Sequence, residues 1–123
     1  MSVAILRQGD ALIAAIQSDL TDAQVLALRD NLSDRVGRHR LRAVIVDVSA
    51  LDVIDSFVAR SLRSMAITTR LRGAETVVVG IQPDVAIAMA HFDLNLKPLR
   101  TAKDLDEALV LLGEQVEEDG GGG

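Results

Sequence analysis

At 123 residues the chain has the length of one domain, and a domain of that size buries enough surface to form a core without disulfides or metals. The chain contains no cysteine, which excludes a disulfide framework, a thiolate nucleophile and a cysteine-ligated zinc site. Its formal net charge is −5 and only 2% of its residues are aromatic, a balance that argues against nucleic acid as the main partner.

The first elements that the sequence predicts are two strands joined by a tight hairpin. Apolar residues dominate 3–6 and 12–16, and Gln8-Gly9-Asp10 lies between them. Glycine and aspartate tolerate the positive φ that such a turn needs. The chain should therefore open with an antiparallel pair of strands.

A helix and a buried strand should follow this pair. Thr21 and Gln24 have the spacing of a capping box, in which each side chain binds the backbone N–H of the other residue. This spacing predicts a helix over 22–36 that ends at Gly37. The β-branched run 42–48 is typical of a strand that is covered on both faces of a sheet.

Two further helices and a strand are predicted in the middle of the chain. Residues 57–72 carry one apolar stripe at helical spacing, which predicts a helix that ends at Gly73. Residues 75–80 include three consecutive valines and predict another buried strand. Pro83 suits the first turn of a helix, because proline lacks the N–H that is unpaired there, so a third helix should run over about 84–92.

The C-terminal part predicts a short strand near 96–99 and a fourth helix. Asp104 is a suitable N-cap for a helix that continues through 108–116. The terminal glycines predict a disordered tail over 119–123, behind a domain at 1–118. The element order predicts a single α/β domain with a small mixed β-sheet, parallel after the leading hairpin and flanked by about four helices.

The sequence lacks the motifs of phosphate-binding loops, dinucleotide sites and nucleophile elbows, so standard nucleotide and acyl-transfer sites are missing and no cofactor is expected. His39 and His91 lie far apart in the chain without ligand-type neighbours, so no metal site is expected either. No signal-peptide pattern and no apolar run of the ~18 residues of a membrane span is present, which predicts a cytoplasmic protein without a membrane partner. One group of basic residues is interpreted as a solvated helix end and loop. This group consists of Arg35, Arg38, His39, Arg40 and Arg42.

Asp55 and Ser56 stand where the run 42–48 gives way to the next helix. On a structural interpretation Asp55 caps the helix and Ser56 is a small polar residue of its first turn. On a functional interpretation Ser56 is a phosphorylation site, because open α/β sheets expose functional loops at the carboxyl ends of their strands and a helix N-terminus stabilises a phosphate. Arg60, one turn further on, could pair with that phosphate, and Asp55 would repel it.

The face of the helix that carries Ser56 continues past Arg60 and includes two large apolar residues. Apolar residues on an otherwise polar face are unusual for full solvent exposure. Either the sheet or the next helix covers them, or they belong to a surface on which a partner docks. The candidate docking face consists of Arg63, Ser64, Ile67 and Leu71.

Two stretches of the sequence resemble the STAS family, named for sulfate transporters and anti-sigma factor antagonists. "VIVDVSALDVIDSFVARSL" is similar to the strand, loop and helix around the regulatory serine of that family, and "LRGAETVVVGIQPDVAIAM" is similar to its next helix end, strand and helix start. The resemblance covers residues 3–117. Within the family, "IDSF" followed by "GIQP" is similar to the RsbS group of single-domain stressosome scaffold proteins.

The resemblance implies a non-enzymatic scaffold that acts in stress-response signalling. Such proteins assemble with RsbR-like paralogues into a large complex that sequesters an RsbT-like serine/threonine kinase, and Ser56 matches the serine that this kinase phosphorylates. The alternative is an anti-sigma factor antagonist with a single partner, but Phe57-Val58-Ala59 departs from the sequence that follows the serine in those proteins. A small hydrolase or nucleotide-binding enzyme that uses Ser56 is a further alternative from another class.

Overall fold

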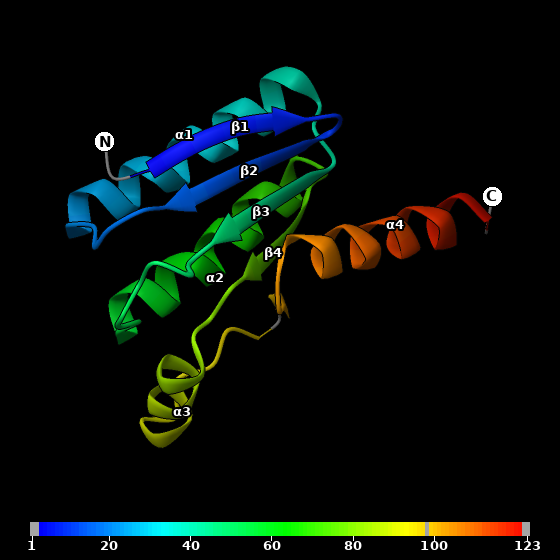
Figure 1. Ribbon diagram of the computed structural model, residues 1–123. Coiled ribbons are helices and arrows are strands. Elements are labelled where there is room, and N and C mark those ends of the chain that lie inside the picture. The colour runs from blue at the N-terminus through cyan, green and yellow to red at the C-terminus, as the bar shows by residue number, and fades with distance from the viewer. Residues whose placement is uncertain (1–2, 98, 122–123) are drawn as a thin grey trace.

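Strands and helices build a five-stranded sheet with helices on both faces (Figure 1). The computed structural model describes residues 3–97 and 99–121. After the first hairpin, each strand is followed by a helix. In chain order the elements are β1 (Val3–Gln8), β2 (Ala11–Ile16), α1 (Asp22–His39), β3 (Ala43–Asp47), α2 (Ser56–Leu71), β4 (Glu75–Val79), α3 (Pro83–His91), β5 (Arg100–Ala102) and α4 (Leu105–Gly121).

The sheet has the order β1-β2-β3-β4-β5, so each strand pairs with its neighbours in the sequence. β1 and β2 are antiparallel and Gln8 pairs with Ala11 across the turn, where Gly9 has a φ of 59°. The other three pairs are parallel. The predicted hairpin and the predicted mixed sheet are therefore both confirmed.

Neighbouring residues of β3 point into two different apolar cores. Val44 lies in the larger core together with Leu32 of α1 and Leu62 of α2, whereas Ile45 lies in the smaller core with Ala108 of α4. Both faces of β3 are thus covered, as its β-branched sequence predicts. Full burial of a Val or Ile side chain contributes roughly 1.5–3 kcal/mol to folding, so this central strand contributes strongly to stability.

All four helices begin at the same edge of the sheet, because each follows the carboxyl end of one of the parallel strands β2–β5. Acidic residues favour helix starts and basic residues favour helix ends, which separates the charges along the strand direction. We call the carboxyl edge the acidic edge, marked by Asp22, Asp55, Asp84, Asp106 and Glu107. The opposite edge is the basic edge, marked by Arg38, His39 and Arg70.

The prediction that the first helix ends at Gly37 is wrong. α1 continues to His39, and Arg40 caps it in the left-handed conformation with a φ of 54°. Gly37 has a packing role instead, because a Cβ atom at this position would overlap the guanidinium group of Arg72. The glycine leaves room for the Arg72 side chain against the last turns of α1.

Two further differences from the predicted elements lie near the C-terminus. The last strand is Arg100–Ala102 rather than 96–99, because Leu96 and Leu99 are buried in the larger core and belong to a turn in which the Leu99 N–H donates to the Leu96 carbonyl over 2.7 Å. α4 begins after Asp104, whose Oδ1 accepts from the Glu107 N–H at 2.9 Å, as predicted. The helix runs to Gly121 and so includes three of the five residues assigned to the tail, while 122–123 lie outside the described residues.

Candidate functional site: the β3–α2 loop and the outer face of α2

Ser56 is the first residue of α2, and its side chain is exposed. Asp55 is the N-cap, and its Oδ1 accepts a hydrogen bond from the Val58 N–H at 2.8 Å, so the predicted cap is confirmed. The first helical backbone bond runs from the Ala59 N–H to the Asp55 carbonyl. The N–H groups of Ser56 and Phe57 precede that ladder and point out of the helix start, which favours negative charge there.

The loop before Ser56 is anchored by two apolar side chains and is exposed between them. Leu51 and Ile54 are buried in the larger core, and the Leu51 N–H donates to the Val48 carbonyl at 2.9 Å. Between these anchors Asp52 and Val53 are exposed, and the Val53 side chain retains 66% of its accessible surface. The loop therefore presents a defined backbone to solvent immediately before the candidate phosphorylation site.

A second segment, at the start of α3, fixes this loop from the side. The side-chain amide of Gln82 donates to the carbonyl oxygens of Ser49 at 2.7 Å and Leu51 at 3.2 Å. Gly80 has a φ of 80°, and a Cβ atom there would lie 2.8 Å from the Cβ of Ser49 and 3.0 Å from a carboxylate oxygen of Asp47. Glycine is thus required where β4 leaves the sheet beside the turn after β3.

No sequence motif assigned a site role to Gly80 or Gln82, although one signal was present. Gln82 occupies the N-cap of α3, a position that favours Ser, Thr, Asp or Asn, and it makes no capping bond to its own helix. A glutamine in that position has an amide group that is available to a neighbouring segment. Here that segment is the loop that carries Ser56.

The outer face of α2 extends from Ser56 to the end of the helix. Arg60 is exposed, Arg63 and Ser64 are half-buried, and neither arginine forms an ion pair with any residue within 3–97 and 99–121. Ile67 and Leu71 retain 55% and 84% of their accessible surface, so neither the sheet nor a helix among the described elements covers them. Of the two interpretations of these apolar residues, coverage by the described sheet and helices is excluded.

A mostly apolar cavity of about 380 Å³ borders the far end of this face. It lies between α2 and β4, and both Ile67 and Leu71 line it together with Ala74 and Leu99. The candidate docking face thus combines polar and basic residues near Ser56 with an apolar recess at the other end of the helix.

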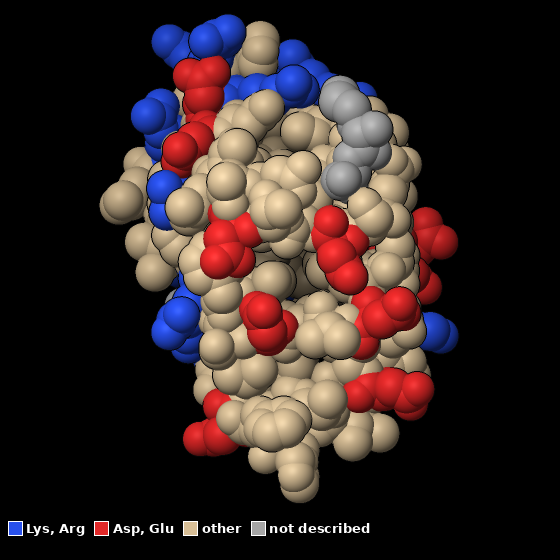
Figure 2. Space-filling model, turned by 90° about the vertical axis from the view of Figure 1, so that its left-hand side faces the viewer, with Lys and Arg blue, Asp and Glu red and all other residues tan. Residues whose placement is uncertain are grey.

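The acidic edge surrounds Ser56. Figure 2 views the side of the molecule that lies at the left in Figure 1, and shows acidic side chains spread across the middle of that face around a shallow hollow. Asp52 and Asp55 lie in the loop itself. Asp84 lies in the first turn of α3, the helix whose N-cap Gln82 contacts this loop. A phosphate on Ser56 would therefore add negative charge to an already acidic surface.

Within 3–97 and 99–121, no three His, Asp or Glu residues are placed to hold a metal ion, and the Ser56 hydroxyl makes no hydrogen bond to a histidine. His91 packs edge-on against Phe92 with ring centroids 5.3 Å apart. None of the helices in the described ranges is both long enough and apolar enough to cross a bilayer.

Comparisons with known proteins relate the chain to stressosome components. It is 30% identical to a serine-to-glutamate variant of RsbS from Moorella thermoacetica, with a TM-score of 0.79, covering 95% of this chain and 99% of that one. A chain in a structure of the stressosome, described as a signal integration and transduction hub, is 28% identical with a TM-score of 0.71, over 92% of this chain and 98% of that one.

A curated relative from Bacillus subtilis, the RsbT co-antagonist protein RsbRA, is 29% identical over 98 residues, which are 71% of this chain and 36% of that protein. The chain therefore spans about a third of the length of this relative. The family model for the STAS domain matches residues 2–108, which include the β3–α2 loop and all five strands of the sheet. With that match over most of its length and with this fold, the chain belongs to the STAS domain family.

Proposed function

We propose that this chain is a non-enzymatic stressosome scaffold protein of the RsbS type. It assembles with RsbR-like paralogues into a large complex, holds an RsbT-like serine/threonine kinase, and releases that kinase when Ser56 is phosphorylated. The likeness to RsbS and to a stressosome chain over nearly the whole length supports the scaffold role. The similarity to part of an RsbT co-antagonist supports a role in the same signalling system.

The observation that carries the proposal is the exposure of Ser56 at a helix start whose cap is supplied by another residue. Because Asp55 accepts the Val58 N–H, the Ser56 hydroxyl is not needed to hold the loop and is accessible to a kinase. Other serines nearby suit modification less well. Ser61 is buried with 7% of its surface exposed, Ser64 is half-buried, and Ser49 lies in the turn that packs against Gly80.

A phosphate on Ser56 would change the charge of the loop without requiring a new fold. It brings about −1.5 to −2 charges next to the carboxylate of Asp55, and the two groups repel each other. The free N–H groups at the helix start and the guanidinium group of Arg60 would draw the phosphate toward α2. We infer that this rearrangement alters the surface formed by the β3–α2 loop and the outer face of α2, on which the kinase docks.

The proposal is tested by purifying the protein together with the RsbR-like and RsbT-like proteins encoded by the same organism. Light scattering should show a very large particle that contains the kinase, and incubation with ATP should release the kinase and place phosphate on Ser56. A small one-to-one complex with an anti-sigma factor would instead support the antagonist alternative. Turnover of a substrate by the purified protein alone would contradict the absence of enzymatic activity.

A further inference from the structure

β1 and α1 lie along one margin of the molecule (Figure 1). Residues of both elements line a groove between them. Alternate residues of β1 face α1, and these are Val3, Ile5 and Arg7. The β1 wall thus changes along its length from apolar to basic. Since the start of β1 lies near the acidic edge and its end near the basic edge, this change follows the charge separation of the whole domain.

The apolar part of the groove is a cavity of about 470 Å³. Val3 and Ile5 line it from the strand, while Ala27 and Leu28 line it from α1. Val3 and Ile5 are only partly buried, so their side chains retain surface that a ligand can cover. Apolar walls of this kind are typical of sites that bind the apolar portion of a small molecule.

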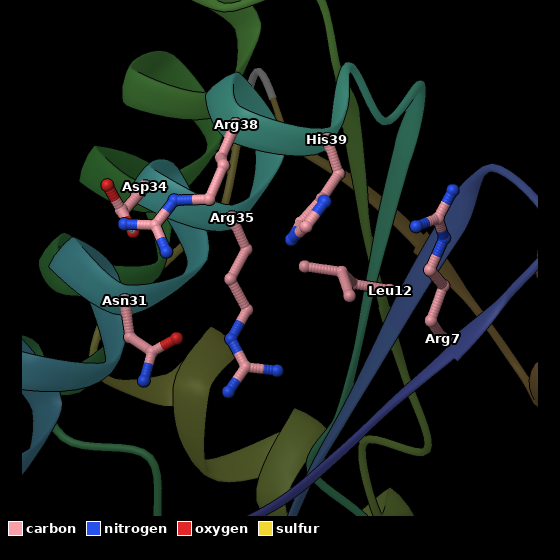
Figure 3. Close-up of a pocket in the computed structure, with 7 residues that line it drawn as sticks. All are labelled: Arg7, Leu12, Asn31, Asp34, Arg35, Arg38 and His39. Carbon is pink, nitrogen blue, oxygen red and sulfur yellow. Dashed lines mark ion pairs between the residues drawn. The ribbon is translucent and has the colours of Figure 1, made fainter.

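The basic part of the groove is a cavity of about 560 Å³ at the end of α1 (Figure 3). Arg35 and His39 extend into it from the helix, Arg7 lines it from the strand, and Leu12 forms part of its wall. The Nε of Arg7 donates to the Gly9 carbonyl at 3.1 Å, which holds this side chain close to the hairpin. Three of these groups are basic, although the chain as a whole has a net charge of −5.

Among the described residues that line this cavity there is one carboxylate, and it already forms an ion pair. Asp34 pairs with Arg38 across one helical turn with an N–O distance of 3.0 Å, and Figure 3 shows this pair turned to one side of Arg35. Arg35 itself is half-buried and forms no ion pair with a residue in the described part of the chain. Its charge therefore remains available to an anion that enters the groove.

Asn31 and Arg35 line both cavities, so the apolar and the basic parts adjoin each other. From this arrangement we propose that the groove between β1 and α1 binds a small amphipathic anion. The apolar body of the ligand lies against Val3, Ile5 and Leu28, and its carboxylate or phosphate lies beside Arg35 and His39, with Arg7 on the opposite wall. Because the anionic head lies at the basic edge, away from Ser56, this site is independent of the proposed kinase switch.

Isothermal titration calorimetry with four probes separates the two requirements of the site. Octanoate and octyl phosphate carry both a chain and a charge, inorganic phosphate carries only the charge, and octanol carries only the chain. We expect saturable binding of the two octyl anions, weaker at high salt, and at least about tenfold weaker binding of inorganic phosphate and octanol. If octanoate and octyl phosphate each bind, the site accepts an anionic head group in general and is not specific for a carboxylate or for a phosphate.

Variants on the two walls test where the ligand lies. Arg35→Gln and Arg7→Gln should each weaken octanoate binding about tenfold, and Ala27→Glu should weaken it further by placing a carboxylate in the apolar part. Arg29→Gln is the matched control, because Arg29 lies on the same helix, pairs with Asp30 and lines neither cavity. If Arg35→Gln does not fold, Arg7→Gln and Ala27→Glu decide the test.

Several results would overturn the site. If neither octanoate nor octyl phosphate shows saturable binding, the proposed site is wrong. If inorganic phosphate or octanol binds as tightly as octanoate, charge and apolar surface do not act together in binding. Equal loss of affinity in Arg29→Gln and Arg7→Gln would place the ligand elsewhere. None of these results bears on phosphorylation of Ser56, which is measured separately.

Discussion

The side-chain amide of Gln82 lies 2.7 Å from the carbonyl oxygen of Ser49, a residue 33 positions earlier in the chain. This hydrogen bond connects the start of α3 to the turn after β3 and so supports the loop that presents Ser56. A residue outside the loop thereby helps to hold the loop in place.

Replacing Gln82 by alanine should loosen this loop while leaving the fold intact. Two hydrogen bonds to carbonyl groups are lost, so the free energy of unfolding should fall by about 1 kcal/mol. Amide hydrogen exchange should become faster at residues 49–54. Gln17→Ala, at an exposed position before α1, is the control and should change neither quantity.

Replacing Ser56 by alanine should abolish phosphorylation with little effect on stability. Because Asp55 supplies the cap, the loss in free energy of unfolding should be at most about 1 kcal/mol. The modification is measured by incubation with the kinase and ATP followed by phosphopeptide mapping. Ser49→Ala is the control and should be phosphorylated normally. A phosphopeptide confined to another serine, or a large drop in melting temperature of Ser56→Ala, would contradict the assignment.

Replacing Ser56 by aspartate tests whether charge at this position controls docking of the kinase. The variant adds one negative charge at the acidic edge without the three acceptor oxygens of a phosphate. It should bind the kinase more weakly than Ser56→Ala does, and the difference should shrink at high salt, because exposed charges are screened. Equal kinase affinities for both variants and for the phosphorylated protein would rule out this switch.

Asp55→Asn separates the capping role of Asp55 from its charge. Asparagine is as good an N-cap as aspartate, so the unphosphorylated variant should unfold within about 0.5 kcal/mol of the parent. Phosphorylation should then lower the melting temperature less in this variant than in the parent, because repulsion from the neighbouring carboxylate is gone. Asp55→Ala is the comparison, since it removes both the charge and the cap and should cost about 1 kcal/mol.

Gly80→Ala should lower the free energy of unfolding more than the addition of a single methyl group suggests. The added Cβ atom would lie 2.8 Å from the Cβ of Ser49 on a residue with a φ of 80°, and such strain costs on the order of 1–3 kcal/mol. Gly113→Ala provides a control of opposite sign. Gly113 lies within α4 with no atom near its added Cβ, so alanine there should stabilise the helix by up to about 1 kcal/mol. Urea denaturation measures both.

Local patterns predicted those parts of the fold that depend on local chemistry. The capping box of Thr21 and Gln24, the Asp55 cap and the buried strand β3 are all present in the structure. Gly37 was misassigned because its role depends on Arg72, which is distant in the sequence. The strand predicted over 96–99 was misplaced because apolar residues of a buried turn have the same composition as those of a strand.

The candidate site shows the same division between local and distant effects. Helical spacing indicated the face of α2 that carries Ser56, Ile67 and Leu71 but left the exposure of the two apolar residues open. Gln82 and the groove beside α1 depend on segments that meet only in three dimensions. The basic residues assigned to a solvated helix end include Arg35, Arg38 and His39, which line that groove. Their arrangement depends on Arg7 of the neighbouring strand, which spacing within one segment cannot indicate.

The strand order β1-β2-β3-β4-β5 also has a consequence for the synthesis of the protein. Each strand pairs with the strand made just before it, so the sheet grows from one side as the chain leaves the ribosome, without waiting for a distant partner. The hairpin forms within microseconds and provides the first template, whereas each parallel pairing requires the intervening helix to close a longer loop. Nascent chains that end after β3 should therefore already protect the amides of β2 from hydrogen exchange.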